Sequence, residues 1–83
     1  MKVEIYGRED CPFCKKAKQF AGVYFGSYDY IDTPKGDAFA ELRQKIVDGY
    51  AKDVNTVPQI FIGEEHIGGY DDLVAWTLRK DTV

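Results

Sequence analysis

Cys11 and Cys14 are separated by two residues in the stretch REDCPFCKKAK, which covers residues 8–18. Two thiols at this spacing can bind a metal ion, close a structural disulfide, or exchange electrons with another disulfide. A structural zinc site needs about four ligands, and this chain offers one cysteine pair and a single histidine, His66. A structural disulfide across so short a loop adds little stability. The spacing therefore favours a redox pair, with two buried thiols of no function as the plain alternative.

Length and composition define the class of protein. With 83 residues the chain has room for a single domain, residues 1–83, with one core. A hydrophobic fraction of 45% and a charged fraction of 30% are typical of a soluble globular protein. The net charge of -3 argues against nucleic acid, and no apolar run reaches the roughly 20 residues that span a bilayer. We expect a cytoplasmic monomer that binds neither nucleic acid nor membrane.

Apolar periodicity and breaking residues predict an alternating series of elements. The expected strands are 2–6, 28–32, 59–62 and 66–67, and the expected helices are 12–24, 37–49 and 71–80. Two helices carry apolar stripes, made of Ala17, Phe20, Ala21 and Tyr24 in the first and of Phe39, Leu42, Ile46 and Val47 in the second. Gly7 is expected to end the first strand, and Pro12 suits the first turn of a helix.

The order of these elements, β-α-β-α-β-β-α, predicts an α/β fold. The first strand, helix and strand form a right-handed parallel unit, whereas the late hairpin must be antiparallel. A mixed four-stranded sheet flanked by helices accommodates both. This fold puts Cys11 and Cys14 at the turn from the first strand into the first helix.

The two cysteines are not equivalent at a helix start. Unpaired N–H groups and the positive end of the helix dipole favour an anion there, and a thiolate is the nucleophile of disulfide exchange. Arg8, Lys15 and Lys18 add positive charge nearby. Cys11 should be exposed at the first turn, and Cys14, one turn further, should be enclosed. This asymmetry predicts that Cys11 attacks and Cys14 resolves.

Two distant segments sharpen the interpretation. TVPQIF begins at Thr56 and holds a proline before an apolar strand, where a cis bond is one option, and HIGGYDDL precedes the last helix. With CPFC, these segments resemble the dithiol motif, the cis-proline segment and the glycine-pair segment of the glutaredoxin family. The resemblance covers nearly the whole chain and is closest to small bacterial and phage-type members. It implies a thioredoxin fold, no bound cofactor or metal, and glutathione as co-substrate.

The resemblance also implies a role for each matching position. Cys11 would form the mixed disulfide with glutathione, and Cys14 would resolve protein disulfides. Pro58 would be the cis-proline facing the cysteines. Val57 would pair its backbone N–H and C=O with the cysteine of glutathione, as an added strand does, and Thr56 would flank that contact.

The glycine-pair segment would hold the γ-glutamyl end of glutathione. Gly69 and Tyr70 would shape the groove wall, and N–H groups at the helix start, near Asp71 and Asp72, would hold the γ-glutamyl carboxylate. Asp72 would pair with the γ-glutamyl ammonium. Ordinary helix capping by the acidic pair is the alternative, and both roles can coexist. Arg8 would face the glycine carboxylate, with a solvated surface charge as its alternative.

Two positions depart from the family pattern. Phe13 replaces the usual tyrosine in the glutathione groove, so a hydroxyl is lost and the ring remains. Asp71 stands where Ser, Thr or Cys is more common, and its carboxylate should weaken the binding of a carboxylate ligand. His66 is expected to be structural, and Trp76 to pack the last helix onto the sheet. Gln44 and Lys45 receive no role.

The resemblance implies an enzyme that reduces protein disulfides and glutathione mixed disulfides, with ribonucleotide reductase as a protein substrate by family analogy. After Cys11 attacks, the mixed disulfide is resolved by Cys14 or by glutathione. Two alternatives stay open. One is a thioredoxin-like donor reduced by a flavin-dependent reductase. The other is a dimer that holds an iron–sulfur cluster through Cys11 and glutathione, against which Pro12 argues because cluster-binding relatives commonly lack that proline.

Overall fold

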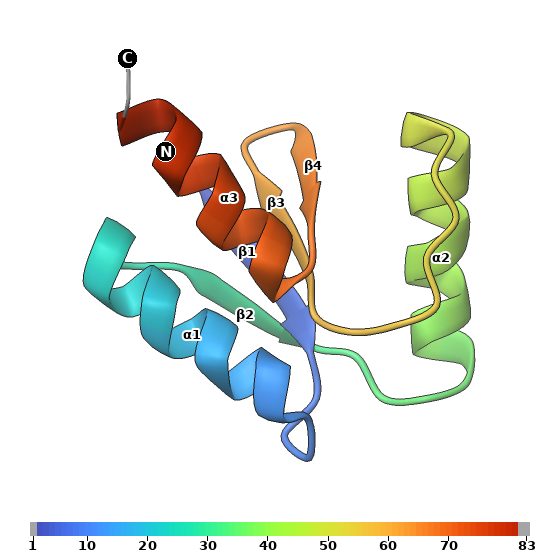
Figure 1. The fold of residues 1–83 in the computed structure, drawn as a ribbon. Coiled ribbons are helices and arrows are strands. Elements are labelled where there is room, and N and C mark those ends of the chain that lie inside the picture. The colour runs from blue at the N-terminus through green and yellow to red at the C-terminus, as the bar shows by residue number, and fades with distance from the viewer. Residues whose placement is uncertain (1, 82–83) are drawn as a thin grey trace.

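The structure of the chain is a computed structural model that describes residues 2–81. Within these residues the elements follow the predicted order (Figure 1): β1 (Val3–Gly7), α1 (Pro12–Phe25), β2 (Asp29–Asp32), α2 (Asp37–Tyr50), β3 (Gln59–Ile62), β4 (Glu65–Gly68) and α3 (Tyr70–Asp81). No helix in this range is long and apolar enough to cross a membrane. Each predicted bound lies within one residue of the observed one. Gly7 belongs to β1, where it pairs with Asp32, and β4 is longer than the two residues expected.

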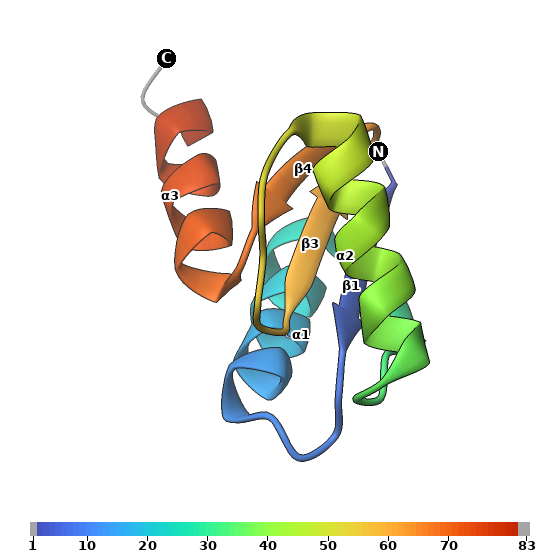
Figure 2. The same ribbon diagram turned by 90° about the vertical axis from the view of Figure 1, so that its right-hand side faces the viewer.

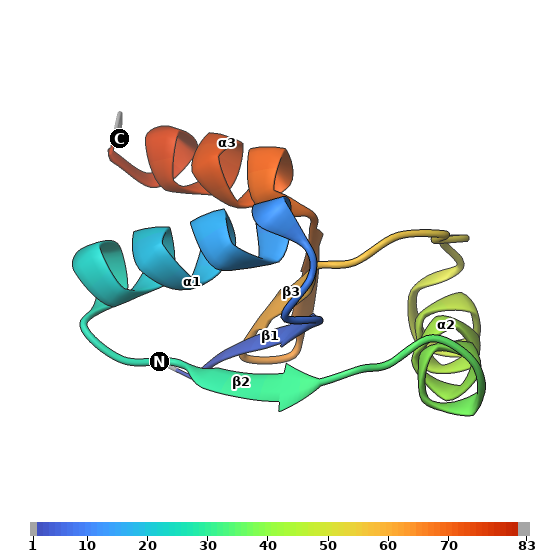
Figure 3. The same ribbon diagram turned by 90° about the horizontal axis from the view of Figure 1, so that it is seen from below.

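The four strands form one mixed sheet in the order β2-β1-β3-β4. β1 pairs parallel to β2 and antiparallel to β3, and β4 pairs antiparallel to β3. The helices α1 and α3 lie side by side on one face, and α2 lies on the other face (Figures 1 and 3). The predicted mixed sheet flanked by helices is therefore confirmed, and this arrangement is the thioredoxin fold.

Alternating side chains divide the core between the two faces. Val3 and Ile5 of β1, and Ile60 and Ile62 of β3, pack in one cluster with α1 and α3, a cluster that contains the buried Trp76 as predicted. On the other face, Phe61 packs against α2 in a second cluster with Leu42 and Ile46.

The two predicted helix stripes are wider than the surfaces that bury them. Val47 is 37% exposed because one residue turns a helix by about 100°, which takes it away from the direction in which Ile46 faces the sheet. Tyr24 is 40% exposed and stacks on Phe20, with ring centroids 5.8 Å apart, so it covers that ring from outside.

The sheet register brings three loops to one end of the molecule. Tyr6, near the end of β1, pairs with Gln59 at the start of β3, and Ile60 pairs with Gly68 at the end of β4. The segments that follow β1, precede β3 and follow β4 therefore leave the sheet at the same end, as Figure 2 shows. These three segments carry the residues of the candidate site.

Candidate active site

Cys11 is the N-cap residue of α1, with extended backbone angles of φ -106° and ψ 114°. The Cys14 N–H donates to Cys11 Sγ over 3.3 Å, and the Cys11 thiol donates to the Val57 carbonyl oxygen over 3.5 Å. Both cysteines are free thiols, and Cys11 is half-buried. The Cys14 N–H, at the start of the helix, stabilises the negative charge that the Cys11 sulfur carries when it attacks or leaves. The Cys11 sulfur is thus held between a helix N-terminus and the loop before β3.

Cys14 is fully buried, as the predicted asymmetry requires. The Arg8 backbone N–H donates to Cys14 Sγ over 3.4 Å. Burial, followed by the hydrogen bond with Cys11, raises the pKa of Cys14 to about 12. In the reduced protein at neutral pH, Cys14 is therefore a protonated thiol beneath Cys11, which is half-buried rather than exposed as predicted.

Gly7 provides the space for Cys14. A Cβ at Gly7 would lie 2.8 Å from Cys14 Sγ and 3.1 Å from Cys14 Cβ, closer than real side chains pack. The strand can approach the resolving sulfur this closely because it ends in glycine. Sequence reasoning missed this role, because a glycine that ends a strand and a glycine that makes room for a neighbour look the same in one sequence.

A pocket of about 320 Å³ lies beside the loop before β3. The Val57–Pro58 peptide bond is cis, as predicted. The pocket is lined by residues from α1, from this loop and from the start of α3: Phe13, Thr56, Val57, Pro58, Gly69, Tyr70, Asp71 and Asp72. These eight residues include every predicted glutathione contact apart from Arg8. The structure therefore brings three distant segments together as the motifs predicted.

The start of α3 carries one half of a capping box, because its N-cap residue is a glycine with no side chain to complete the other half. Gly69 is the N-cap residue, since its carbonyl accepts the Leu73 N–H over 3.0 Å, and its own N–H donates to Asp72 Oδ2 over 2.9 Å. The neighbouring Gly68 has φ 119°, and a side chain there would collide with the Asp72 carboxylate. Asp72 thus performs the capping function that the sequence offered as the alternative.

Arg8 lies outside the pocket, with an oriented side chain. Its Nε donates to the Thr33 carbonyl over 2.9 Å, and its guanidinium carbon lies 5.4 Å from the centre of the Phe39 ring. The side chain is therefore held on two sides, unlike a freely solvated surface charge. Among the side chains that the structure describes, no group of three or more His, Cys, Asp or Glu is placed to hold a metal ion.

A reduced dithiol at the start of a helix, with a cis-proline loop against the outer sulfur, defines the class of protein. On this fold, the arrangement is that of a thioredoxin-fold thiol–disulfide oxidoreductase.

Comparisons with known proteins give the family. The glutaredoxin family model matches residues 3–67. The chain is 40% identical to Glutaredoxin 1 of Escherichia coli over 82 residues, which is 92% of each chain. It is 42% identical to a glutaredoxin of Vibrio cholerae, covering 92% of this chain and 90% of that one. The crystal structure of Glutaredoxin 1 from Francisella tularensis matches with a TM-score of 0.84 at 31% identity, over 99% and 98% of the two chains. The chain belongs to the glutaredoxin family, and Cys11 and Cys14 make it a dithiol member.

Proposed function

We propose that this dithiol glutaredoxin takes its electrons from glutathione and reduces protein disulfides and glutathione mixed disulfides. The observation that supports the proposal is the pocket of about 320 Å³ that is lined by Val57, whose carbonyl accepts from the Cys11 thiol over 3.5 Å. Its lining combines the backbone of Val57, an aromatic ring at Phe13 and a helix N-terminus at Gly69. These features suit a short peptide with a thiol in the middle and a carboxylate at its end.

Glutathione would lie across this pocket with its sulfur at Cys11. The backbone N–H and C=O of Val57 would pair with the cysteine residue of glutathione, as in an added strand. The N–H groups at the start of α3 would hold the γ-glutamyl carboxylate, and Asp72 would pair with the ammonium group. The glycine carboxylate would extend toward Arg8, whose side chain is already oriented by Thr33.

Reduction of a mixed disulfide takes two exchanges. The Cys11 thiolate attacks the glutathione sulfur, a new S–S bond forms, and the old S–S bond breaks with the electron pair leaving on the protein sulfur. That sulfur takes a proton from water. A second glutathione thiolate then attacks the glutathione sulfur bound to Cys11. The products are glutathione disulfide and the Cys11 thiolate, whose charge the Cys14 N–H stabilises from 3.3 Å.

Reduction of a protein disulfide uses both cysteines. Cys11 attacks one sulfur, and Cys14 then attacks Cys11, which releases the reduced protein and closes the Cys11–Cys14 disulfide. Because burial raises the pKa of Cys14 to about 12, Cys14 must lose a proton as it attacks. The thiolates that leave on the substrate protein are the bases that take this proton. Two glutathione molecules restore the dithiol. We include ribonucleotide reductase among the protein substrates on the analogy of the family.

A pair of coupled assays tests the reductant. We expect NADPH oxidation with glutathione and glutathione reductase, and background rates with a flavin-dependent thioredoxin reductase. The opposite result would favour the thioredoxin-like alternative. A visible absorption band in protein purified without oxygen would favour the iron–sulfur scaffold instead.

A further inference from the structure

A buried histidine lies behind the candidate site, on the α2 face of the sheet. His66 stands opposite Phe61 in the β3–β4 pair and is only 6% exposed. Its ring centre lies 5.1 Å from the ring centre of Phe61 and 5.6 Å from that of Tyr50. Its Nε2 lies 2.8 Å from Gln59 Oε1, and its Nδ1 has no hydrogen-bond partner among residues 2–81.

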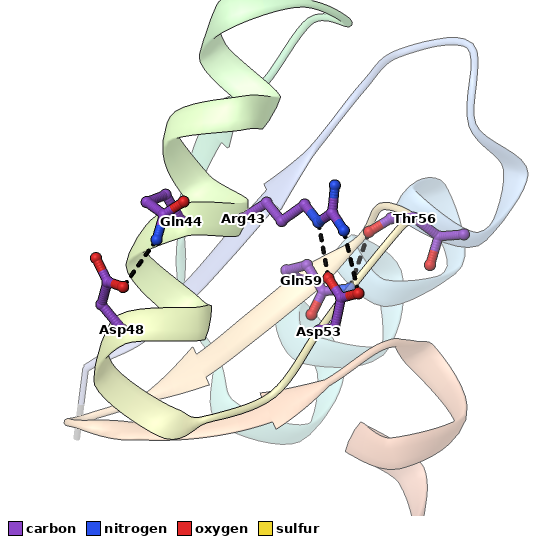
Figure 4. Close-up of polar contacts among 6 residues, drawn as sticks. All are labelled: Arg43, Gln44, Asp48, Asp53, Thr56 and Gln59. Carbon is purple, nitrogen blue, oxygen red and sulfur yellow. Dashed lines mark hydrogen bonds and ion pairs between the residues drawn. The ribbon is translucent and has the colours of Figure 1, made fainter.

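Gln59 connects His66 to the loop before β3. The Gln59 side chain is buried, and its Nε2 donates to the Thr56 carbonyl over 2.8 Å (Figure 4). A carbonyl oxygen only accepts, so the amide nitrogen of Gln59 must face Thr56 and its oxygen must face His66. His66 Nε2 therefore carries the proton and donates. The result is a directed chain of two hydrogen bonds from His66 through Gln59 to Thr56.

This chain ends on the peptide unit that the proposed function uses. The Thr56 carbonyl and the Val57 N–H belong to one planar peptide group, so an anchor on the carbonyl also sets the direction of the N–H. The Val57 carbonyl that follows accepts from the Cys11 thiol over 3.5 Å. The chain segment before Thr56 is anchored separately, since Arg43 of α2 donates to both carboxylate oxygens of Asp53, over 2.7 and 3.1 Å (Figure 4).

Packing alone does not account for a histidine at this position. The ring lies between two aromatic rings, where an apolar ring of similar size would bury no polar atom. A buried acceptor without a partner, such as Nδ1, costs stability. What His66 supplies is the N–H that orients Gln59.

We propose that His66, acting through Gln59, is a positioning residue that fixes the Thr56–Val57 peptide plane for binding the cysteine backbone of glutathione. The proposal rests on the proposed function, because it assigns the Val57 N–H to glutathione. His66 does not touch the substrate and takes no part in sulfur chemistry.

Substitutions at His66 separate positioning from packing. His66→Phe keeps a ring between Tyr50 and Phe61 and removes the donor, whereas His66→Gln restores a donor near the place of Nε2. Gln59→Leu removes both hydrogen bonds, in case His66→Phe does not fold. Ile62→Val is the matched control, since it weakens the core packing on the opposite face of β3 and leaves the hydrogen bonds between His66, Gln59 and Thr56 in place.

The measured quantities are KM and kcat with a glutathione mixed disulfide, and the amide NMR shift of Val57. We expect a KM about five- to tenfold higher in His66→Phe and Gln59→Leu, with kcat within twofold of wild type. We expect recovery in His66→Gln, and no change in Ile62→Val. The Val57 amide shift should move and recover in the same pattern.

Two results would overturn the proposal: a KM and Val57 shift unchanged in Gln59→Leu, or the same changes in Ile62→Val. The NMR measurement needs no glutathione. If wild type fails to turn over the mixed disulfide, the proposed function is wrong, while the Val57 shift still decides whether His66 sets the peptide plane.

Discussion

Cys11 Sγ lies 3.5 Å from the Val57 carbonyl oxygen, although the two residues are 46 positions apart in the chain. The contact joins the loop after β1 to the loop before β3. The pairing of the two strands brings these loops together, because Tyr6, next to the end of β1, pairs with Gln59 at the start of β3. A ligand that pairs with the backbone of Val57 is thereby directed at the Cys11 sulfur.

Gly7→Ala should destabilise the protein, because the new methyl group would lie 2.8 Å from Cys14 Sγ. We expect a loss of about 1–3 kcal/mol in the free energy of unfolding, measured with urea. Gly49→Ala is the control, since a Cβ there meets no atom within 4 Å in the described chain, and it should stabilise α2 by about 0.5–1 kcal/mol. Adding Cys14→Ala should recover part of the Gly7→Ala loss. Equal effects of the two glycine substitutions would contradict this account of Gly7.

Alkylation of the native reduced protein at pH 7 should modify Cys11 alone. Cys14 is fully buried, and burial raises its pKa to about 12, so it offers neither access nor a thiolate. Mass spectrometry after iodoacetamide treatment should show one adduct in the native state and two after unfolding in urea. Two adducts formed at similar rates in the native protein would show that the two sulfurs are equivalent.

Stability should fall as the pH falls below about 6.5. Burial, and then Lys52, lower the pKa of His66, while Asp72 opposes them. The unfolded chain then binds the proton more readily than the folded one, so this stability is present above the unfolded pKa and is lost as the pH falls through the folded pKa.

His66 is the only histidine in the sequence, so His66→Gln should flatten the slope of unfolding free energy between pH 7.5 and 5.5. An equal slope in wild type and His66→Gln would show that His66 is not the group responsible for the loss of stability.

Asp71→Asn should strengthen glutathione binding. Asp71 is exposed and lines the pocket near the helix start proposed to hold a carboxylate. Removing a like charge there should lower the Kd of glutathione about two- to fivefold, with less effect at high salt. Glu41→Gln removes one exposed charge from α2, outside this pocket, and should leave the Kd unchanged. A Kd that rises in Asp71→Asn would place the carboxylate of glutathione elsewhere.

Local patterns predicted the features that depend on neighbours in sequence. The alternation of Val3 and Ile5, and the position of Cys11 before Pro12, determine a strand face and a helix cap within a few residues. The resemblance to a family supplied the cis Val57–Pro58 bond, since propensity alone favours trans.

The features that were missed depend on contacts between distant segments. Gly7 makes room for Cys14 across a loop, and Gln59 links His66 to Thr56 across two strands. The apolar stripe predicted for α2 was too wide, since it included the partly exposed Val47. The sequence pattern does not determine how much of a helix surface the sheet covers. One local signal was present: Gln59 is a polar residue at the start of an apolar strand, and a buried polar side chain usually has hydrogen-bond partners.

Reduction of a glutathione mixed disulfide by wild type, Cys11→Ser and Cys14→Ser, coupled to glutathione reductase, tests the central claim most directly. We predict that Cys11→Ser falls to the uncatalysed rate. Cys14→Ser should keep this activity and lose the reduction of protein disulfides, because only that route needs the second thiol. Cys11→Ser activity equal to that of wild type would contradict the account.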